Sequence, residues 1–189
     1  MRVLPSAERA DQPVFYYDLG DPGCYLAAEQ VNSALPRVPE WEPVLAAEIR
    51  PHAPHPDVAQ IAEQARRLGL QPLRWPEGWP PDTRQAMLAA TYAKRIGRAV
   101  AFSLAAFRQA FAAGRDLADP DTIMLAGAAC EMHPAALLKG MATRSILEAL
   151  TAATHRAHSA GVMSLPAIQV EDQIFSGDPA LAAAAQAMR

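Results

Sequence analysis

Four consecutive residues, Asp21, Pro22, Gly23 and Cys24, place a carboxylate and a thiol within one turn of chain. An Asp followed by a Pro is a common helix start, with the Asp side chain as N-cap and the Pro as the first helical residue. A carboxylate in that place can also act as a general acid or base and move a proton on a substrate carbon or hydroxyl. A pure capping role and a catalytic role for Asp21 both stay open at this point.

The thiols of this sequence favour packing over reactivity. Cys24 has no second cysteine within its motif, so the motif cannot cycle a disulfide, and a buried free cysteine mostly behaves as a small hydrophobe. Cys130, the other cysteine, is interpreted as a core residue. His155 and His158 are spaced to share a helix face, but nothing nearby supplies the further ligands that a metal needs. We therefore expect no metal site.

Strand and helix patterns alternate around the motif. A β-branched and aromatic run at 14–18 predicts a strand that ends just before it, and the motif then opens a helix. Residues 41–45 predict a second strand, at an edge or end position of a sheet because Pro43 lacks a ladder donor. A helix is expected over 57–69, ending at a glycine.

From residue 82 to about residue 160 only helical signals occur, enough for about four helices. Asp82 with Gln85 resembles a capping box, and Asp119 with Pro120 makes a second N-cap pair. Stops are expected near glycines, and apolar stripes indicate helix packing against helix. The stops are Gly97, Gly114 and Gly161, and the stripes are Leu88, Tyr92 and Ile96, then Val100, Leu104, Phe107 and Phe111, then Ile146, Leu147 and Leu150.

Two short β runs, 166–170 and 173–175, are separated by a two-residue connection typical of a hairpin, and Asp178 with Pro179 predicts the cap of a last helix. The order is β-α-β-α, a helical block, then β-β-α. This order predicts an α/β protein with a thioredoxin-like fold split by an all-helical insertion. The predicted division is 14–81 with 161–189 as the thioredoxin-like domain, 82–160 as the helical insertion domain, and 1–13 as a flexible N-terminal arm.

Several segments, in the right order over nearly the whole chain, resemble the DsbA-like group that contains the 2-hydroxychromene-2-carboxylate isomerases and the kappa-class glutathione transferases. These segments are 15–18 followed by 21–27, 41–45, 68–76, 111–117 and 161–166. The resemblance implies that the motif stands at a helix N-terminus, where N–H groups and the helix dipole stabilise a thiolate. It also implies a cis peptide bond at Leu165–Pro166 facing the motif, with the Leu165 backbone pairing an extended thiol peptide such as glutathione.

The first motif position departs from that group. The oxidoreductases have a cysteine there, and the isomerases and transferases have a serine whose hydroxyl donates to the glutathione sulfur, whereas this chain has Asp21. An ionised carboxylate cannot donate, and its charge would raise the pKa of a nearby thiol. Near the end, 177–179 stands where the group tends to have Gly-x-Asp-Arg, so Asp178 is the candidate for the γ-glutamyl contact.

The composition excludes some classes of partner. The 189 residues are 51% hydrophobic with a net charge of −3, so neither nucleic acid nor an anionic membrane is an expected partner. Residues 1–13 lack the apolar run of a signal or anchor, and two cysteines are too few for a secreted disulfide framework, so we expect a cytoplasmic protein. A homodimer is expected only by analogy with related proteins.

The sequence thus predicts an isomerase or glutathione-dependent transferase acting on a small aromatic substrate, with Asp21 in the catalytic position and Cys24 supporting it. The expected binding residues are Pro22, Gly23, Trp75, Trp79, Leu165, Pro166 and Asp178, with His52 and His55 as candidates for the rim of the cleft and Tyr92 as a further candidate lining residue. The first alternative is a ligand-binding protein that kept the fold and lost the chemistry. The second is a thiol-disulfide oxidoreductase.

Overall fold

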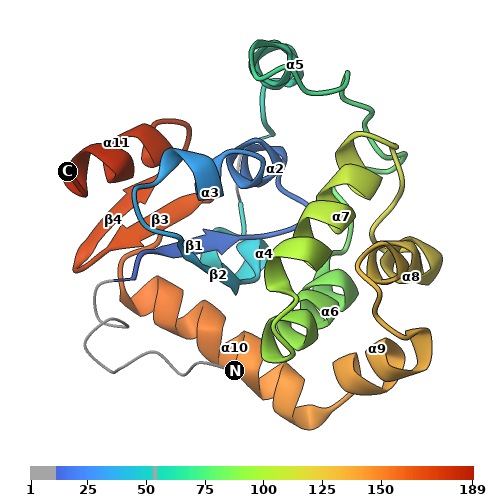
Figure 1. Ribbon diagram of the computed structural model, residues 1–189. Helices are drawn as coiled ribbons and strands as arrows, with labels where there is room; N and C mark the ends of the chain where they lie inside the picture. The colour runs from blue at the N-terminus through green and yellow to red at the C-terminus, as the bar shows by residue number, and fades with distance from the viewer. Residues whose placement is uncertain (1–11, 53–54) are drawn as a thin grey trace.

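A four-stranded sheet lies at the centre of the computed structural model, which describes residues 12–52 and 55–189, so most of the predicted arm 1–13 lies outside the described residues. The strands are β1 (Val14–Tyr17), β2 (Glu40–Pro43), β3 (Ala167–Val170) and β4 (Gln173–Ser176). Their order is β2-β1-β3-β4, with β1 parallel to β2 and antiparallel to β3, and β3 antiparallel to β4. Residues far apart in the chain therefore share one sheet (Figure 1).

The second strand is shifted by one to two residues from the prediction. It covers Glu40–Pro43 rather than 41–45, and Leu45 instead precedes a short helix, where its N–H donates to Thr154 Oγ1 at 3.0 Å. The strand lies at the sheet edge, as the proline predicted, because an edge strand needs no ladder donor on its outer side.

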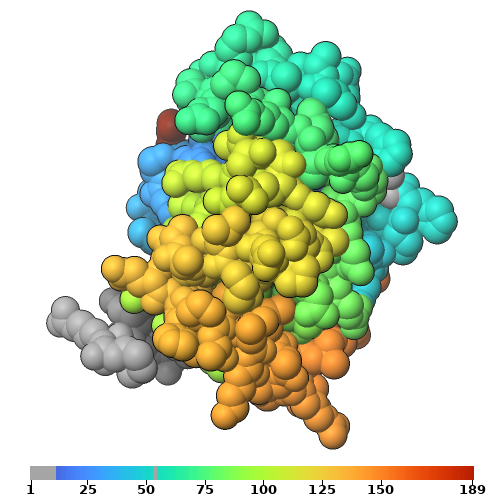
Figure 2. All heavy atoms as spheres, turned by 90° about the vertical axis from the view of Figure 1, so that its right-hand side faces the viewer, coloured from blue at the N-terminus to red at the C-terminus, as the bar shows by residue number. Residues whose placement is uncertain are grey.

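In the residues that the structure describes, five helices accompany the sheet, and five more, between α5 (Val58–Arg67) and β3, form the helical block. The first set is α2 (Pro22–Ala28), α3 (Val31–Ala34), α4 (Ala46–Ile49), α5 (Val58–Arg67) and α11 (Ala180–Ala187). The second set is α6 (Arg84–Arg95), α7 (Ala99–Phe111), α8 (Pro120–Ala129), α9 (Pro134–Met141) and α10 (Arg144–Ser159), one more than the rough count expected from sequence. Figure 2 shows the outer side of this block, a continuous surface coloured green to orange. In the described part of the chain no helix combines the length and apolar character needed to cross a bilayer.

Helix ends follow the local signals in part. Asp21 and Asp119 cap α2 and α8 as predicted, each accepting a backbone N–H, from Cys24 at 2.8 Å and from Asp121 at 2.9 Å. The predicted capping box at Asp82 is wrong, because Thr83 is the residue before α6 and the Asp82 carboxylate accepts the Arg84 N–H instead.

The helix end predicted near Gly114 is confirmed, and this glycine also lies where two segments of the chain meet. This glycine has a φ of 72°, and a Cβ on it would lie 3.1 Å from the Arg74 Cβ. The Arg74 N–H donates to the Phe111 carbonyl at 2.8 Å, which ties the loop before the helical block to the end of α7.

Each face of the sheet has its own core, since alternate side chains of a strand point to opposite faces. On one face Phe15 and Tyr17 of β1 are fully buried, and the Tyr17 ring packs against Phe107 of α7 at 5.9 Å. The opposite face belongs to Tyr16 and Ala167, which pack in one cluster with Ala153 and Ala157 of α10. Of the predicted stripe residues, Ile96 and Leu147 are instead 46% and 39% exposed.

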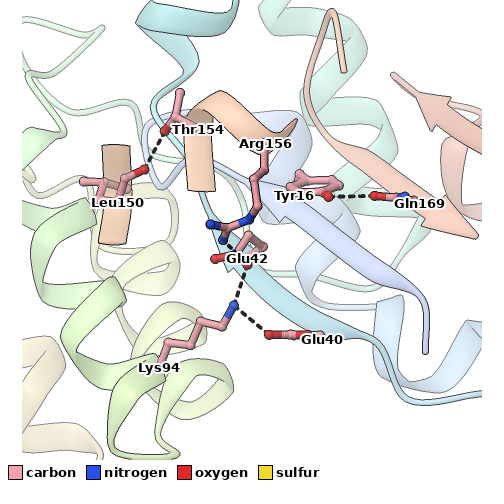
Figure 3. Close-up of polar contacts among 8 residues, drawn as sticks. All are labelled: Tyr16, Glu40, Glu42, Lys94, Leu150, Thr154, Arg156 and Gln169. Atoms are coloured by element: carbon pink, nitrogen blue, oxygen red, sulfur yellow. Dashed lines mark hydrogen bonds and ion pairs between the residues drawn. The ribbon is translucent and has the colours of Figure 1, made fainter. Parts of the chain in front are cut away.

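The edge strand β2 carries charges that hold the helical block in place (Figure 3). Lys94 of α6 donates to Glu42 at 2.6 Å and pairs with Glu40 at 2.7 Å, and Arg156 of α10 reaches Glu42 at 3.4 Å. Because Glu42 is mostly buried, with 13% of its side chain exposed, its two cationic partners offset the cost of removing the carboxylate from water. These contacts help to set the position of α6, and Thr83, the residue before that helix, lines the cleft described next.

Candidate functional site

The predicted motif forms the N-terminal turn of α2, directly after β1 and a short loop. Asp21 has an extended backbone and caps the helix, Pro22 occupies the first helical position, and the Tyr25 N–H donates to the Asp21 carbonyl at 3.1 Å. The local sequence explains this turn. The first N–H groups of a helix have no partner within the helix, and Pro22 has no N–H to leave unpaired, while the Asp21 side chain accepts one of the others.

The peptide bond Leu165–Pro166 is cis, as the resemblance implied, and it lies against this turn. A Cβ built on Gly23 would stand 3.2 Å from Pro166 Cδ and 3.1 Å from Asp21 Oδ1, so the two segments are in close contact and only glycine fits without a shift. Within the described residues the Leu165 backbone N–H and C=O have no hydrogen-bond partner. They are therefore available to a ligand.

A cleft of about 490 Å³ opens in front of these two segments. The motif and Leu165–Pro166 form one side of it, the loop from Trp79 to Pro81 with Thr83 forms another, and Ala46, Ala47, Arg50 and His55 stand at its remaining edge. A second pocket of about 220 Å³ lies between α2, α5 and α11 and shares Gly23, Pro166 and Asp178 with the cleft. The cleft joins both halves of the split sheet domain to the start of the helical block.

The Asp21 carboxyl has unusual electrostatics for a helix cap. Burial raises the pKa of Asp21 to about 6, the N–H of Cys24 opposes that rise, and the negative charge of Asp18 adds to it. A carboxyl with a pKa near 6 populates both protonation states close to neutral pH, which is what a general acid or base requires. The protonated form can also donate a hydrogen bond, which the ionised form cannot.

Asp18, which sequence reasoning missed, lines the same cleft from the end of β1. It is 3% exposed and accepts the Gly20 N–H at 2.9 Å, the Ala46 N–H at 2.9 Å and the Thr83 hydroxyl at 3.2 Å. The available signal was an acid at the end of a predicted buried strand, three residues before the motif. The sequence could not supply its partners, since two of them are 28 and 65 residues away.

Cys24 points into the core and does not line either pocket. It is fully buried, and burial, followed by the charge of Asp21, raises its pKa well above the usual thiol value. Because the thiolate is the nucleophile, both effects suppress thiol reactivity. The geometry therefore favours the packing role.

We expect Cys24 in the folded protein to react with a thiol reagent at least about 100-fold more slowly than free cysteine at pH 7.5. Stopped-flow measurement with a chromogenic disulfide, followed by mass spectrometry of each cysteine peptide, gives the rate. Cys130 serves as an internal comparison, since it is also buried, at 5% exposure. Rapid modification of Cys24 would restore the oxidoreductase hypothesis.

The remaining predicted residues divide between cleft and core. Trp79 lines the cleft and donates from Nε1 to the Gly20 carbonyl at 3.2 Å, and His55 packs near its ring with centroids 5.7 Å apart. Trp75 lies behind it, edge-on to the Trp79 and Phe111 rings, and does not line the cleft. Neither His52 nor Tyr92 lines it.

Asp178 reaches both pockets but does not cap α11 as predicted, because Pro179 is the residue before that helix and no side chain caps it. The Asp178 carboxylate instead accepts from the side-chain amides of Gln60 at 2.9 Å and Gln64 at 3.0 Å, both on α5. This pairing keeps a negative charge at the junction of the two pockets. In the described ranges no group of His, Cys, Asp and Glu side chains has the arrangement of a metal site.

The family profile of the DSBA-like thioredoxin domain matches residues 14–189, and the chain therefore belongs to that family. Two solved structures are similar to this chain in fold. A 2-hydroxychromene-2-carboxylate isomerase superposes with a TM-score of 0.81 at 17% identity, over 93% of each chain. A probable DsbA oxidoreductase from Streptomyces coelicolor gives 0.75 at 17% identity, over 94% of this chain and 88% of that one.

A third likeness is to the cytosolic disulfide reductase DsbM from Pseudomonas aeruginosa, with a TM-score of 0.61 at 12% identity over 86% of this chain and 87% of that one. That enzyme has also been solved with GSH. No curated protein is similar enough in sequence to count as a match. At such identities the structural likeness shows a shared fold, and the function has to be inferred from the residues of the site.

Proposed function

We propose that this protein is an isomerase that moves a proton on a small aromatic substrate bound in the cleft, with Asp21 as the acid–base group. One observation carries the proposal: a carboxyl at the N-terminus of α2 lines the cleft and has a pKa raised to about 6. Capping alone does not require such a pKa, because a solvated cap carboxylate stays ionised at neutral pH.

The proton balance of the reaction is simple. Ionised Asp21 takes a proton from one substrate atom, and the protonated carboxyl returns it to another atom of the same molecule, so the enzyme ends in its starting state. The helix N-terminus stabilises the ionised form, and burial stabilises the neutral form. The two opposing effects leave the carboxyl able to perform both steps.

The walls of the cleft suit an aromatic or hydrophobic body with a carboxylate at one end. Ile61, Trp79 and Leu165 offer apolar surface. Arg50 and His55 stand at the edge, and within the described residues Arg50 forms no ion pair, so its guanidinium is available to an anion.

Glutathione is the proposed cofactor. Its extended backbone can pair with the unpartnered N–H and C=O of Leu165, and its γ-glutamyl ammonium can approach Asp178. In this arrangement the thiol would lie beside Asp21. Protonated Asp21 can donate to the sulfur, as the serine of the isomerases and transferases does, whereas ionised Asp21 repels a thiolate.

Turnover assays test the proposed function. Isomerisable aromatic carboxylates are incubated with the protein with and without glutathione, and calorimetry with the same compounds reports binding. Turnover that follows an apparent pKa near 6 supports the proposal. Binding without turnover would favour the alternative of a ligand-binding protein.

We expect Asp21→Ser to bind glutathione about tenfold more tightly than the parent at pH 8, because the change removes a negative charge beside the thiol and supplies a donor. The gain should largely vanish at pH 5, where Asp21 is already protonated. Calorimetry at both pH values measures it, with Asp178→Ser as a control that should weaken binding. Equal affinity of parent and Asp21→Ser at pH 8 would show that contacts other than the carboxylate limit binding.

A further inference from the structure

Two carboxyls, Asp18 and Asp21, line the same cleft three residues apart, but they are held very differently. The Asp18 side chain accepts three donors. Its Oδ1 accepts the Gly20 N–H, and its Oδ2 accepts both the Ala46 N–H and the Thr83 hydroxyl. The Asp21 side chain accepts the Cys24 N–H on Oδ1, and the Cys24 thiol and the Gly23 N–H favour its ionised form more weakly.

This difference decides which carboxyl holds a proton. Burial raises the pKa of Asp18, and its three hydrogen-bond donors oppose that rise. Because both oxygens of Asp18 already accept a backbone N–H, a proton on either atom would disturb one of these bonds. Asp21 can place a proton on Oδ2 and keep its cap bond on Oδ1. Since two like charges in a partly desolvated site cannot both be stable, the proton goes to Asp21.

We propose that Asp18 is a positioning residue whose clamped negative charge biases Asp21 toward its protonated, hydrogen-bond-donating form. The inference deepens the function proposed for Asp21 and rests on the same site. Asp18 itself exchanges no proton with a substrate in this role.

The three hydrogen bonds to the Asp18 carboxylate form a clamp that joins three parts of the fold. Gly20 belongs to the motif loop, Ala46 begins α4, and Thr83 precedes α6 at the start of the helical block. The packing is tight there, because a Cβ on Gly20 would lie 2.5 Å from Thr83 Cγ2. The helical block thereby contributes to the electrostatics of the cleft through a hydroxyl that reaches Asp18.

Other charged or titratable groups lie around the pair, and among them Cys24 acts on Asp21 and Asp82 acts on Asp18. They come from each element packed around the cleft: Cys24 of α2, Arg50 after α4, His55 before α5, Asp82 before α6 and Asp178 before α11. Asp82 acts on Asp18 by charge repulsion. None of these groups forms a hydrogen bond to the Asp18 carboxylate, so the clamp is specific to the three donors.

Carbon-13 NMR titration of side-chain carboxyls tests the inference without any substrate. The spectrum of Asp21→Asn assigns the Asp21 signal. We expect Asp18→Asn to lower the titration midpoint of Asp21 by about one pH unit while leaving it above that of an exposed carboxyl, since burial remains. A midpoint unchanged from the parent would overturn the proposal.

Thr83→Val is the matched control. It removes the hydroxyl that donates to Asp18 but keeps the negative charge of Asp18. The titration midpoint of Asp21 should therefore stay within about 0.3 pH units of the parent value, while the melting temperature falls because a hydrogen bond is lost. Equal shifts in both variants would mean that packing rather than charge sets the midpoint, and would refute the inference.

The parent protein gives a measurement that needs no variant. Asp18 should remain ionised through the pH range in which Asp21 gains its proton, and an Asp18 signal that titrates at higher pH than Asp21 would also refute the inference. Because these readouts report the carboxyls themselves, failure to find isomerase turnover leaves them unaffected, and the two proposals can fail separately.

Discussion

Asp21→Asn should lower kcat of the proposed isomerisation by about 10²- to 10⁴-fold, because an amide cannot take and return the substrate proton. Asparagine is as good an N-cap as aspartate, so the helix start should survive. The kcat of the parent should change with pH around the Asp21 pKa of about 6, and the residual kcat of Asp21→Asn should not change there. Initial rates from pH 4.5 to 8.5 measure both.

Asp119→Asn is the matched control, since Asp119 also caps a helix ahead of a proline but stands at the start of α8, outside both pockets. Its rate should equal that of the parent. If Asp21→Asn retained full activity, the carboxylate would have no part in the chemistry and the proposed mechanism would fail.

The stability of Asp21→Asn separates loss of function from loss of fold. The folded pKa of Asp21, about 6, lies above the ordinary carboxyl value of about 3.9, so the stability it contributes is present below pH 4 and is lost as the pH rises through 6. Asp21→Asn should therefore be more stable than the parent at pH 7.5, by about 1 to 3 kcal/mol, and equal to it near pH 3.5. Urea unfolding at the two pH values measures the difference.

Phe107→Ala should lower the free energy of unfolding by about 3 to 5 kcal/mol. The ring is fully buried on α7, 5.9 Å from the Tyr17 ring of β1 and 6.1 Å from the Tyr25 ring of α2. Its loss would leave a cavity where the helical block, the sheet and the motif helix meet. Such a cavity cannot close easily, because β1 and α2 are each fixed by other contacts.

Urea unfolding with a common m-value gives this loss. Leu138→Ala on α9, where the side chain is 51% exposed, is the control and should change the free energy by no more than about 0.5 kcal/mol. A loss below 1 kcal/mol for Phe107→Ala would mean that the block and the sheet fold independently of this contact.

Local signals in the sequence were sufficient for the elements that carry the motif. Asp21 with Pro22 predicted a capped helix start, and the same pair at Asp119 predicted another, because capping involves only residues within one turn. The aromatic and β-branched run at 14–18 predicted β1 for a similarly local reason. The order of these elements was enough to predict the fold.

The same local reasoning failed where distant partners compete for a side chain. Asp178 has the sequence of a helix cap, yet its carboxylate is bound by Gln60 and Gln64 of α5, more than a hundred residues away. Trp75 and Trp79 were equivalent candidates in the sequence, but only Trp79 reaches the cleft, because Phe111 of α7 packs against the ring of Trp75.

The sequence by itself determined which chemical groups stand at the start of α2: the carboxyl of Asp21, and the thiol of Cys24 with no second cysteine in its motif. Only the tertiary structure decided what that carboxylate can do, because its pKa depends on desolvation and on charges through space. Folding brings Leu165–Pro166 against Gly23 of the motif, and it places the charge of Asp18, held by Ala46 and Thr83, close enough to act on Asp21. Those contacts link residues that no local pattern connects.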